Sequence, residues 1–344
     1  MLVQVACALQ RRGLPQHVVS VSNRAENARL LEAGGVGVTD LGLTGLVGLP
    51  GALLKLRSLI AAHRPSVVHG WMYHGNLVAA LGHRVAPGRR GRRLFWGLRA
   101  SNMDGERYGR INWLSARLSR WPDVVIANSA AGARFHMALG YRPRRLEIVP
   151  NGVDCVRFRP DEQLRGVMRQ ELAIGPDAVV AIHVARVDAM KDQPTFLAAM
   201  QHLPHVTGLL VGKGTDALTL PANVRALGMR GDVQRLYAGA DIVVSSSAFG
   251  EGFSNVIAEG MAAGLIPIAT NVGDASAIVG DTGAIVPPRT ANDLATAIAA
   301  AAGLSAAERR AQGLAARARI EGQFTIDNAI DAYAHLYGQT TSKA

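Results

Sequence analysis

Short apolar runs alternate with helix-forming segments along nearly the whole chain, and this alternation limits the possible folds more than any other feature. A buried parallel strand is a continuous apolar run, whereas a helix repeats its apolar positions every three to four residues. In the first half we expect strands at 17–22, 36–43, 66–69, 94–98, 124–127 and 146–149, with helices at 1–12, 26–32 and 53–62. In the second half we expect strands at 179–183, 207–211, 224–227, 242–245, 266–270 and 283–286. The Ala-rich stretch 291–318 and the segment 326–337 are expected to be helical. The pattern predicts an α/β protein with two doubly wound, Rossmann-like domains.

The turn-rich segment Pro150-Asn151-Gly152-Val153-Asp154 separates the two sets of strands. We therefore expect a first domain at 1–154, a second at 155–322, and a terminal helix at 323–344. A return of this helix to the first domain is one alternative. Ligands of doubly wound sheets bind beyond the carboxyl ends of the strands, so the cleft between the domains is the expected site.

The composition favours a cytoplasmic protein. Hydrophobic residues make up 49% of the 344, yet no apolar run is long enough to span a membrane, and residues 1–9 lack the basic start of a signal peptide. Cys7 and Cys155 provide neither a disulfide framework nor a metal-binding spacing, which fits a reducing compartment. We expect no metal and no bound cofactor.

The positive charge is concentrated in the first half. Residues 1–150 hold 21 Lys and Arg against 7 Asp and Glu, with clusters at 84–93 and 142–145. Such clusters suit an anionic membrane surface or a phosphorylated acceptor, and an ordinary solvated surface is an equal alternative. Nucleic acid is not expected as a partner, because neither a recognised binding motif nor interleaved aromatic residues accompany the charge.

A pair of carboxylates, Glu251 and Glu259, stands out in the second half. Glu251 lies in a glycine-rich turn, and Glu259 lies eight residues later in a pattern that predicts a helix, about 12 Å further along. The intervening backbone, Gly252-Phe253-Ser254-Asn255, would present the start of that helix to a phosphate. The arrangement suits a nucleotide-diphosphate sugar, although for the pair alone solvated surface charges are the commoner explanation.

Two further segments follow predicted strands of the second half. Arg186 and Lys191 leave the strand at 179–183 and can converge on one diphosphate, although a pair of surface cations in a turn is commoner. The turn Gly212-Lys213-Gly214 nominally begins a dinucleotide-binding fingerprint, but Pro221 leaves no room for the helix that this motif requires. We expect a nucleotide-facing turn there, and contact with the base from the backbone of Gly228 and Met229.

In the first half, Trp71, Tyr73, His74 and Asn76 follow the strand at 66–69 and are expected to line a polar pocket of the kind that binds carbohydrate. A structural role for a lone histidine such as His74 is the commoner case. Arg99 follows the strand at 94–98 and is expected to point into the cleft.

With these features together, the chain resembles the GT-B glycosyltransferases of family 4, which are retaining nucleotide-sugar enzymes. The resemblance rests on Glu251 to Ala262, on the segments 270–274 and 283–288, on Arg186 with Lys191, and on the linker 150–154. The segment 71–76 is similar to a subgroup that builds bacterial surface polysaccharides or exopolysaccharides.

The resemblance implies roles for these residues. Glu251 would hold the donor sugar, Glu259 the ribose, and Arg186 and Lys191 the diphosphate. Many family members have a histidine where this chain has Arg99, so Arg99 would act electrostatically, or His74 would take over a contact. The implied activity is transfer from a nucleotide-diphosphate sugar, with UDP as carrier, to a lipid-linked or saccharide acceptor at the inner face of the membrane.

Family chains open with a strand and a glycine-rich loop, whereas this sequence begins within the helix that follows them. That strand would occupy the middle of the first sheet, so its neighbours are expected to be left unpaired or forced together. Two alternatives to transferase activity stay open. One is a nucleotide-sugar epimerase of the same fold, and the other, which the missing strand favours, is an inactive nucleotide-sugar-binding protein.

Overall fold

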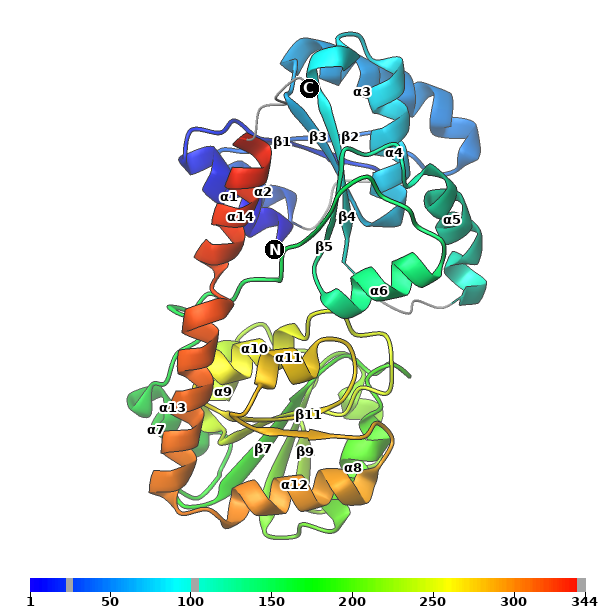
Figure 1. Cartoon of the computed structure of the whole chain (residues 1–344). Helices are drawn as coiled ribbons and strands as arrows, with labels where there is room; N and C mark the ends of the chain where they lie inside the picture. Colours follow the sequence, from blue (N-terminus) through cyan, green and yellow to red (C-terminus); the bar gives the residue numbers. More distant parts are fainter. Residues whose placement is uncertain (23–26, 100–104, 339–344) are drawn as a thin grey trace. The chain divides into compact units, whose positions relative to one another are not determined.

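The computed structural model describes residues 1–22, 27–99 and 105–338, and it divides into two compact units (Figure 1). Unit 1 comprises Met1–Gly152 and Asp327–Ala344, and unit 2 comprises Val153–Ile326. Each unit is an α/β structure built on parallel strands. None of the helices in the described residues has the length and hydropathy that crossing a lipid bilayer requires.

The strands of unit 1 form two separate parallel sheets. One pairs β1 (His17–Ser20) with β2 (Gly37–Asp40). The other has the order β3 (Val67–Trp71), β4 (Arg93–Leu98), β5 (Val124–Ala127) and β6 (Leu146–Ile148). Within the described residues no backbone pairing joins β1 or β2 to β3. The expected disruption at the centre of this sheet therefore takes the form of neighbours left unpaired.

The helices of unit 1 bury the apolar faces of these strands. The core around β4 and β5 includes Leu94, Trp96 and Val125, all fully buried. The C-terminal helix packs on unit 1, because Arg93 donates a hydrogen bond from Nη1 to the carbonyl oxygen of Leu336 (3.1 Å). The helices are α1 (Leu2–Arg11), α2 (Ala28–Ala33), α3 (Leu49–His63), α4 (Met72–Val85), α5 (Gly105–Leu118), α6 (Ala130–Ala138) and α14 (Ile326–Gly338).

Unit 2 contains one six-stranded parallel sheet with the order β12-β11-β10-β7-β8-β9. The strands are β7 (Val179–Val184), β8 (Val206–Val211), β9 (Val224–Ala226), β10 (Ile242–Ser245), β11 (Ile266–Thr270) and β12 (Ala284–Val286). The chain runs outward from β7 to β9 and then returns to continue from β10 to β12. The order therefore reverses between β7 and β10, which makes this the topological switch point of the sheet.

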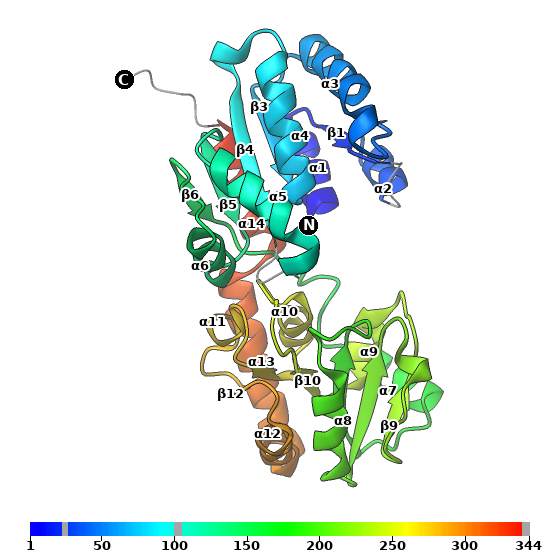
Figure 2. The same cartoon turned by 90° about the vertical axis from the view of Figure 1, so that its right-hand side faces the viewer.

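Helices cover both faces of the unit 2 sheet. One face is buried by α8 (Gln193–Gln201) and α12 (Ala291–Gly303), which lie side by side (Figure 2). The other face is buried by α7 (Glu162–Glu171), α9 (Val233–Gly239), α10 (Asn255–Ala262), α11 (Ala275–Val279) and α13 (Ala306–Gln323). Both faces of β7 and β10 are thus covered, which explains why these strands are continuous apolar runs.

One predicted helix is in fact two. The stretch 291–318 is interrupted at Leu304 and Ser305, and α13 begins at Ala306. Ser305 accepts a hydrogen bond at Oγ from the backbone N–H of Glu308 (3.3 Å), and Glu308 accepts one from the backbone N–H of Ser305 (2.8 Å). This capping box was present in the sequence as Ser-x-x-Glu, but the high helix propensity of alanine on both sides concealed it.

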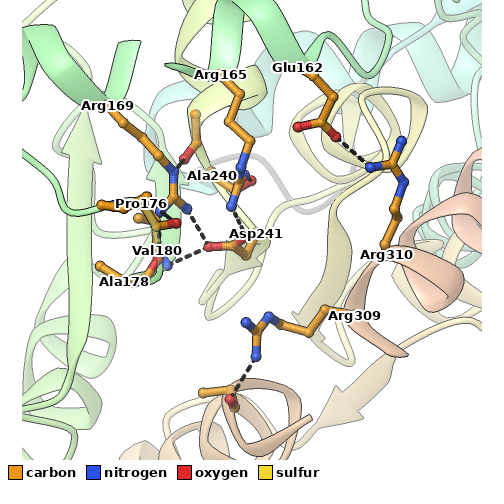
Figure 3. A network of polar contacts seen from close by, with 12 residues as sticks. Glu162, Arg165, Arg169, Pro176, Ala178, Val180, Ala240, Asp241, Arg309 and Arg310 are labelled. Atoms are coloured by element: carbon orange, nitrogen blue, oxygen red, sulfur yellow. Dashed lines mark hydrogen bonds and ion pairs between the residues drawn. The ribbon is translucent and has the colours of Figure 1, made fainter. Parts of the chain in front are cut away.

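Two arginines anchor the amino end of the unit 2 sheet on a single carboxylate, Asp241 (Figure 3). Arg165 donates to its Oδ1 (2.6 Å), while Arg169 (2.9 Å) and the backbone N–H of Val180 (2.8 Å) donate to its Oδ2. Asp241 precedes β10 and Val180 lies in β7, so the network ties α7 to the two strands that flank the switch point.

Candidate functional site

Two loops meet beyond the carboxyl ends of β7 and β10. The segment 185–192 follows β7, and the segment 246–253 follows β10. The backbone N–H of Ala248 donates to the carbonyl oxygen of Met190 (2.8 Å), which holds the loops together. β7 and β10 are parallel, and the strand order reverses between them, so the loop after β7 leads to α8 on one face of the sheet and the loop after β10 leads to α10 on the other. Doubly wound sheets bind their ligands at such a point.

Lys191 and Glu251 form an ion pair where these loops meet. Lys191 Nζ donates to Glu251 Oε1, and the hydroxyl of Ser247 donates to the same oxygen (2.7 Å). Both charged side chains are largely buried, with 24% and 12% of their surfaces exposed. A cation and a hydrogen-bond acceptor are therefore held side by side at the switch point.

Hydrogen bonds to the backbone carbonyl groups of Lys191 and its neighbour hold this part of the loop in place. The hydroxyl of Ser246 donates to the carbonyl oxygens of Lys191 (2.9 Å) and Asp192 (3.0 Å). His183 Nε2 lies 3.0 Å from that hydroxyl, and since the hydroxyl proton is already donated, the imidazole is the donor here. Burial first, and then the charge of Lys191, lowers the pKa of His183 to about 4, so the ring is neutral at physiological pH.

Sequence reasoning did not single out His183, Ser246 or Ser247. The available signal was the run Ser245-Ser246-Ser247 directly after a buried strand. Hydroxyl groups at the carboxyl end of a parallel strand are well placed to hold neighbouring loops.

The loop that carries Glu251 depends on glycines. Gly250 has φ of +83°, and Gly273 has φ of +66°. A Cβ on Gly273 would lie 2.6 Å from the carbonyl oxygens of Glu251 and Gly252. The backbone N–H of Asp274 donates to the carbonyl oxygen of Gly252 (3.0 Å), so the turn after β11 supports this loop directly.

Helix α10 begins immediately after that loop. Phe253 is buried against Phe324, with ring centroids 5.6 Å apart, and Ser254 occupies the N-cap. The side chain of Ser254 forms no capping hydrogen bond within the described residues. The first N–H groups of α10, beginning with Asn255, are thus not capped by Ser254, and the positive end of the helix dipole lies beside Glu251.

Glu259 lies on α10 and is partly buried. Burial raises its pKa to about 7, and the positive charge of Arg157 opposes this increase. Gly260 brings the helix close to β10, since a Cβ there would lie 2.6 Å from Val243. With its pKa raised to about 7, the Glu259 carboxyl group ionises near neutral pH.

Arg186 does not join the Lys191–Glu251 pair. Its Nε (3.1 Å) and Nη2 (2.8 Å) both donate to Asp188 Oδ2, and two thirds of its side chain are exposed. A hydrogen bond from the backbone N–H of Met190, followed by the contact with Arg186, lowers the pKa of Asp188. Arg186 and Lys191 thus contact different carboxylates here, and their expected convergence on one diphosphate stays a prediction.

The turn after β8 lies against the segment after β7. Gly212 needs to be glycine, since its φ is +145° and a Cβ would lie 2.0 Å from the carbonyl oxygen of Ala185. Gly212 donates its N–H to the carbonyl oxygen of Gly228 (2.7 Å), which brings the two predicted nucleotide-facing segments together. Gly214 has φ of +86°, and the Met229 side chain is 79% exposed.

In unit 1, Arg99 is held by its own unit. Its Nη1 donates to the hydroxyl of Tyr333 (3.0 Å), its Nη2 donates to Asn151, and its guanidinium lies 4.6 Å from the ring centroid of Trp71. These contacts fix α14 and the end of β4 to each other. Arg99 therefore has a structural role that the sequence did not indicate, and its electrostatic role stays a prediction.

The expected polar pocket after β3 is corrected by the structure. Asn76 is fully buried and exchanges two hydrogen bonds with the backbone of Gly97 (3.1 Å each). Tyr73 is also buried, and its hydroxyl donates to His136 Nε2 (2.9 Å). Both side chains point into the core because α4 begins at once after β3, whereas His74 is exposed on the first turn of α4.

Two family models match consecutive parts of this sequence. "Glycosyltransferase Family 4" matches residues 1–157, and "Glycosyl transferases group 1" matches residues 178–303. Only 158–177 and 304–344 lie outside the two matches. The chain belongs to the glycosyltransferases that these two models describe. The two models divide the chain between the two structural units, with the Lys191–Glu251 pair in the second.

Curated relatives carry the name D-inositol 3-phosphate glycosyltransferase. The Segniliparus rotundus protein is 29% identical over 238 residues, covering 61% of this chain and 52% of its own length. The Xylanimonas cellulosilytica protein is 32% identical over 245 residues, covering 64% of this chain and 58% of its own. The chain thus spans about half the length of the curated relatives that it matches.

Solved structures share the fold over nearly the whole chain. Anabaena Alr3699/HepE in complex with UDP-glucose superposes with a TM-score of 0.84 at 22% identity, covering 97% of this chain and 94% of that one. A glycosyltransferase from Rickettsia africae gives 0.83 at 18% identity, covering 99% and 94%. At these identities the similarity establishes the GT-B fold.

Proposed function

We propose that this glycosyltransferase moves a sugar from a nucleotide-diphosphate sugar, with UDP as the carrier, to a lipid-linked or saccharide acceptor in surface-polysaccharide or exopolysaccharide synthesis. The observation that carries the proposal is the Lys191–Glu251 pair at the switch point of unit 2. A nucleotide-diphosphate sugar presents a dianionic diphosphate next to sugar hydroxyls, which matches a cation beside a carboxylate.

The proposed chemistry follows from these neighbours. Lys191 would neutralise the diphosphate as it leaves the sugar, and the N-terminus of α10 would add its dipole. Glu251, held by Ser247, would accept hydrogen bonds from sugar hydroxyls. Attack by the acceptor on the face that the diphosphate leaves, with the leaving phosphate taking the acceptor proton, would retain the anomeric configuration.

The comparisons support two finer parts of the proposal. A fold neighbour was crystallised with UDP-glucose, which supports UDP as the carrier. The curated relatives are named for a phosphorylated acceptor, which suits the excess of basic residues in unit 1. In the proposed role, basic residues of unit 1 bind an acceptor that carries phosphate, such as a lipid-linked diphosphate.

The proposal is tested with the purified chain and a panel of UDP-sugars. We expect at least one donor to raise the melting temperature and, with a lipid-linked acceptor, to give a product whose anomeric proton coupling in NMR shows retention. Interconversion of the UDP-sugar without any acceptor would instead identify an epimerase. Stabilisation by the donor without transfer, hydrolysis or interconversion would leave only binding and would overturn the transferase assignment.

Donor affinity is expected to depend on pH through Glu259. Hydrogen bonds donated by ribose hydroxyls favour its ionised form, whereas burial raises its pKa to about 7. Affinity should therefore increase as pH rises through 7, by about tenfold between pH 6 and pH 8. Isothermal titration with UDP-glucose, whose esterified diphosphate does not ionise between pH 6 and pH 8, measures this dependence. The Glu259→Gln variant should show weak, pH-independent binding, and the same pH profile in that variant would exclude Glu259 as its source.

A further inference from the structure

A basic pocket lies at the amino ends of β5 and β6 in unit 1. It has a volume of about 580 Å³, and its wall includes Arg120, Met137, Arg142 and Arg144. Arg120 precedes β5, and Arg144 precedes β6. The pocket is thus formed at the end of the sheet opposite to the loops that follow the strands, and none of the residues assigned to donor binding lines it.

One arginine of this pocket, Arg142, is held in place by hydrogen bonds that do not neutralise its charge. The backbone N–H of Arg142 donates to Ser119 Oγ (2.8 Å), and its Nη1 donates to the carbonyl oxygens of Met137 (3.0 Å) and Tyr141 (2.8 Å). Within the described residues, Arg120 and Arg144 have no recorded hydrogen bond or ion pair.

Few carboxylates are available nearby to compensate for these arginines. Residues 109–146 contain seven arginines and one acidic residue, Asp123. Asp123 accepts the backbone N–H of Leu94 (2.8 Å), and Glu147, just beyond this segment, pairs with Arg145 (2.7 Å). The pocket therefore offers guanidinium groups to an anion from outside the protein.

Helix α5, which leads to the pocket, has an exposed face of unusual composition. Arg110, Trp113, Leu114 and Arg117 are all exposed, and their spacing places them on one side of the helix. Trp113 and Leu114 are 59% and 40% exposed, and the Arg117 guanidinium lies 4.4 Å from the Trp113 ring centroid. Arg120 follows three residues after Arg117, so this face continues to the edge of the pocket.

We propose that this pocket and the exposed face of α5 dock on a bilayer that contains anionic phospholipid. Guanidinium groups pair with lipid phosphates in the pocket, while Trp113 and Leu114 enter the interfacial layer, where tryptophan is favoured. Arg110 and Arg117, on either side of the exposed Trp113 and Leu114, match a headgroup layer above acyl chains. The inference extends the proposed function by placing the enzyme at the membrane that holds a lipid-linked acceptor.

Vesicle flotation tests the docking surface. The protein should bind vesicles of phosphatidylcholine mixed with phosphatidylglycerol and should not bind phosphatidylcholine alone. Each arginine near such a surface contributes about fivefold, so Arg120→Gln with Arg144→Gln should weaken binding roughly 25-fold. The matched control, Arg29→Gln with Arg57→Gln, removes the same charge from exposed positions on α2 and α3 and should bind nearly as the unaltered protein does. An equal loss in the control would overturn the pocket as the binding site.

Tryptophan fluorescence tests the insertion of α5. Brominated phosphatidylcholine in the anionic vesicles should quench part of the emission of the bound protein. Trp113→Phe should still bind, because phenylalanine also enters the interface, but most of this quenching should be lost. Quenching that is unchanged in Trp113→Phe would place another part of the protein in the bilayer and would overturn the proposal.

Two further measurements separate this inference from its alternatives. Inorganic phosphate that stabilises the protein, while anionic vesicles fail to bind it, would identify a site for a soluble anion and reject the bilayer. Stabilisation by UDP-glucose should be the same in the unaltered protein and in the variant lacking Arg120 and Arg144. If vesicle binding fails while that stabilisation persists, only the docking surface is overturned; if UDP-sugars fail to bind, the proposed function is.

Discussion

Replacing Glu251 with glutamine is expected to reduce kcat/KM for the sugar donor by about 10²–10³-fold, which is the usual cost of removing one preorganised polar group from an active site. Glutamine keeps the size of the side chain and can still accept the hydrogen bond from Ser247. It removes the negative charge opposite Lys191 and offers a weaker acceptor to sugar hydroxyls. Steady-state transfer with a saturating acceptor measures the loss.

Two controls make the Glu251 result interpretable. Glu162→Gln removes a carboxylate from an exposed pair with Arg310 in the same unit and should leave transfer unchanged. Ser247→Ala removes the hydroxyl that donates to Glu251 and keeps both charges of the ion pair, so it should have an intermediate effect, about tenfold. Full turnover in Glu251→Gln, with an unchanged melting temperature, would remove the Lys191–Glu251 pair from the proposed mechanism.

Replacing Asp241 with alanine is expected to destabilise unit 2 by about 3–5 kcal/mol, because it leaves two partly buried arginines without their counter-ion. Arg169 is only 5% exposed, and its other hydrogen bonds keep it in place, so it cannot turn to water. The backbone N–H of Val180 loses its acceptor as well. The network links the strands that flank the switch point, so the destabilisation should lower the urea concentration at the midpoint of unfolding.

The tryptophans help to assign this destabilisation. All four lie in the first 121 residues, at 71, 96, 113 and 121, so their fluorescence reports on unit 1. Far-UV circular dichroism should therefore show an earlier transition in Asp241→Ala, while the fluorescence midpoint stays the same. Glu162→Ala breaks an exposed pair and should cost less than about 1 kcal/mol. A similar change in both variants would show that the buried network is no stronger than a surface pair.

Much of the fold could be predicted because buried parallel strands are continuous apolar runs, which can be recognised in a single sequence. The strands at 124–127, 242–245 and 266–270 have the expected limits, and the others differ by a few residues at their ends. These runs are apolar on both faces, so their limits coincide with the first polar residue. The break at Ser305 was missed because the helix propensity of the surrounding alanines outweighs one capping signal.

The site was less predictable, since side-chain partners depend on contacts between distant segments. The proximity of Lys191 and Glu251 follows from strand order, which places the ends of β7 and β10 next to each other. The Arg186–Asp188 pair is local and was overlooked, whereas nothing near Arg99 in the sequence shows that it is held by Tyr333, which is more than 200 residues away. Such pairings are set by tertiary geometry, while spacing alone indicates only which residues are available.

The separation of β1 and β2 from the rest of unit 1 has a consequence for cooperativity. In the described part of the unit, these strands are attached to β3 through side chains alone, such as Val19 and Val68 in the cluster around Leu56. Apolar contacts without a shared backbone ladder allow one part to open while the other stays closed. β1 and β2 are therefore expected to open locally, with backbone amides that exchange with solvent more readily than those of β4 and β5.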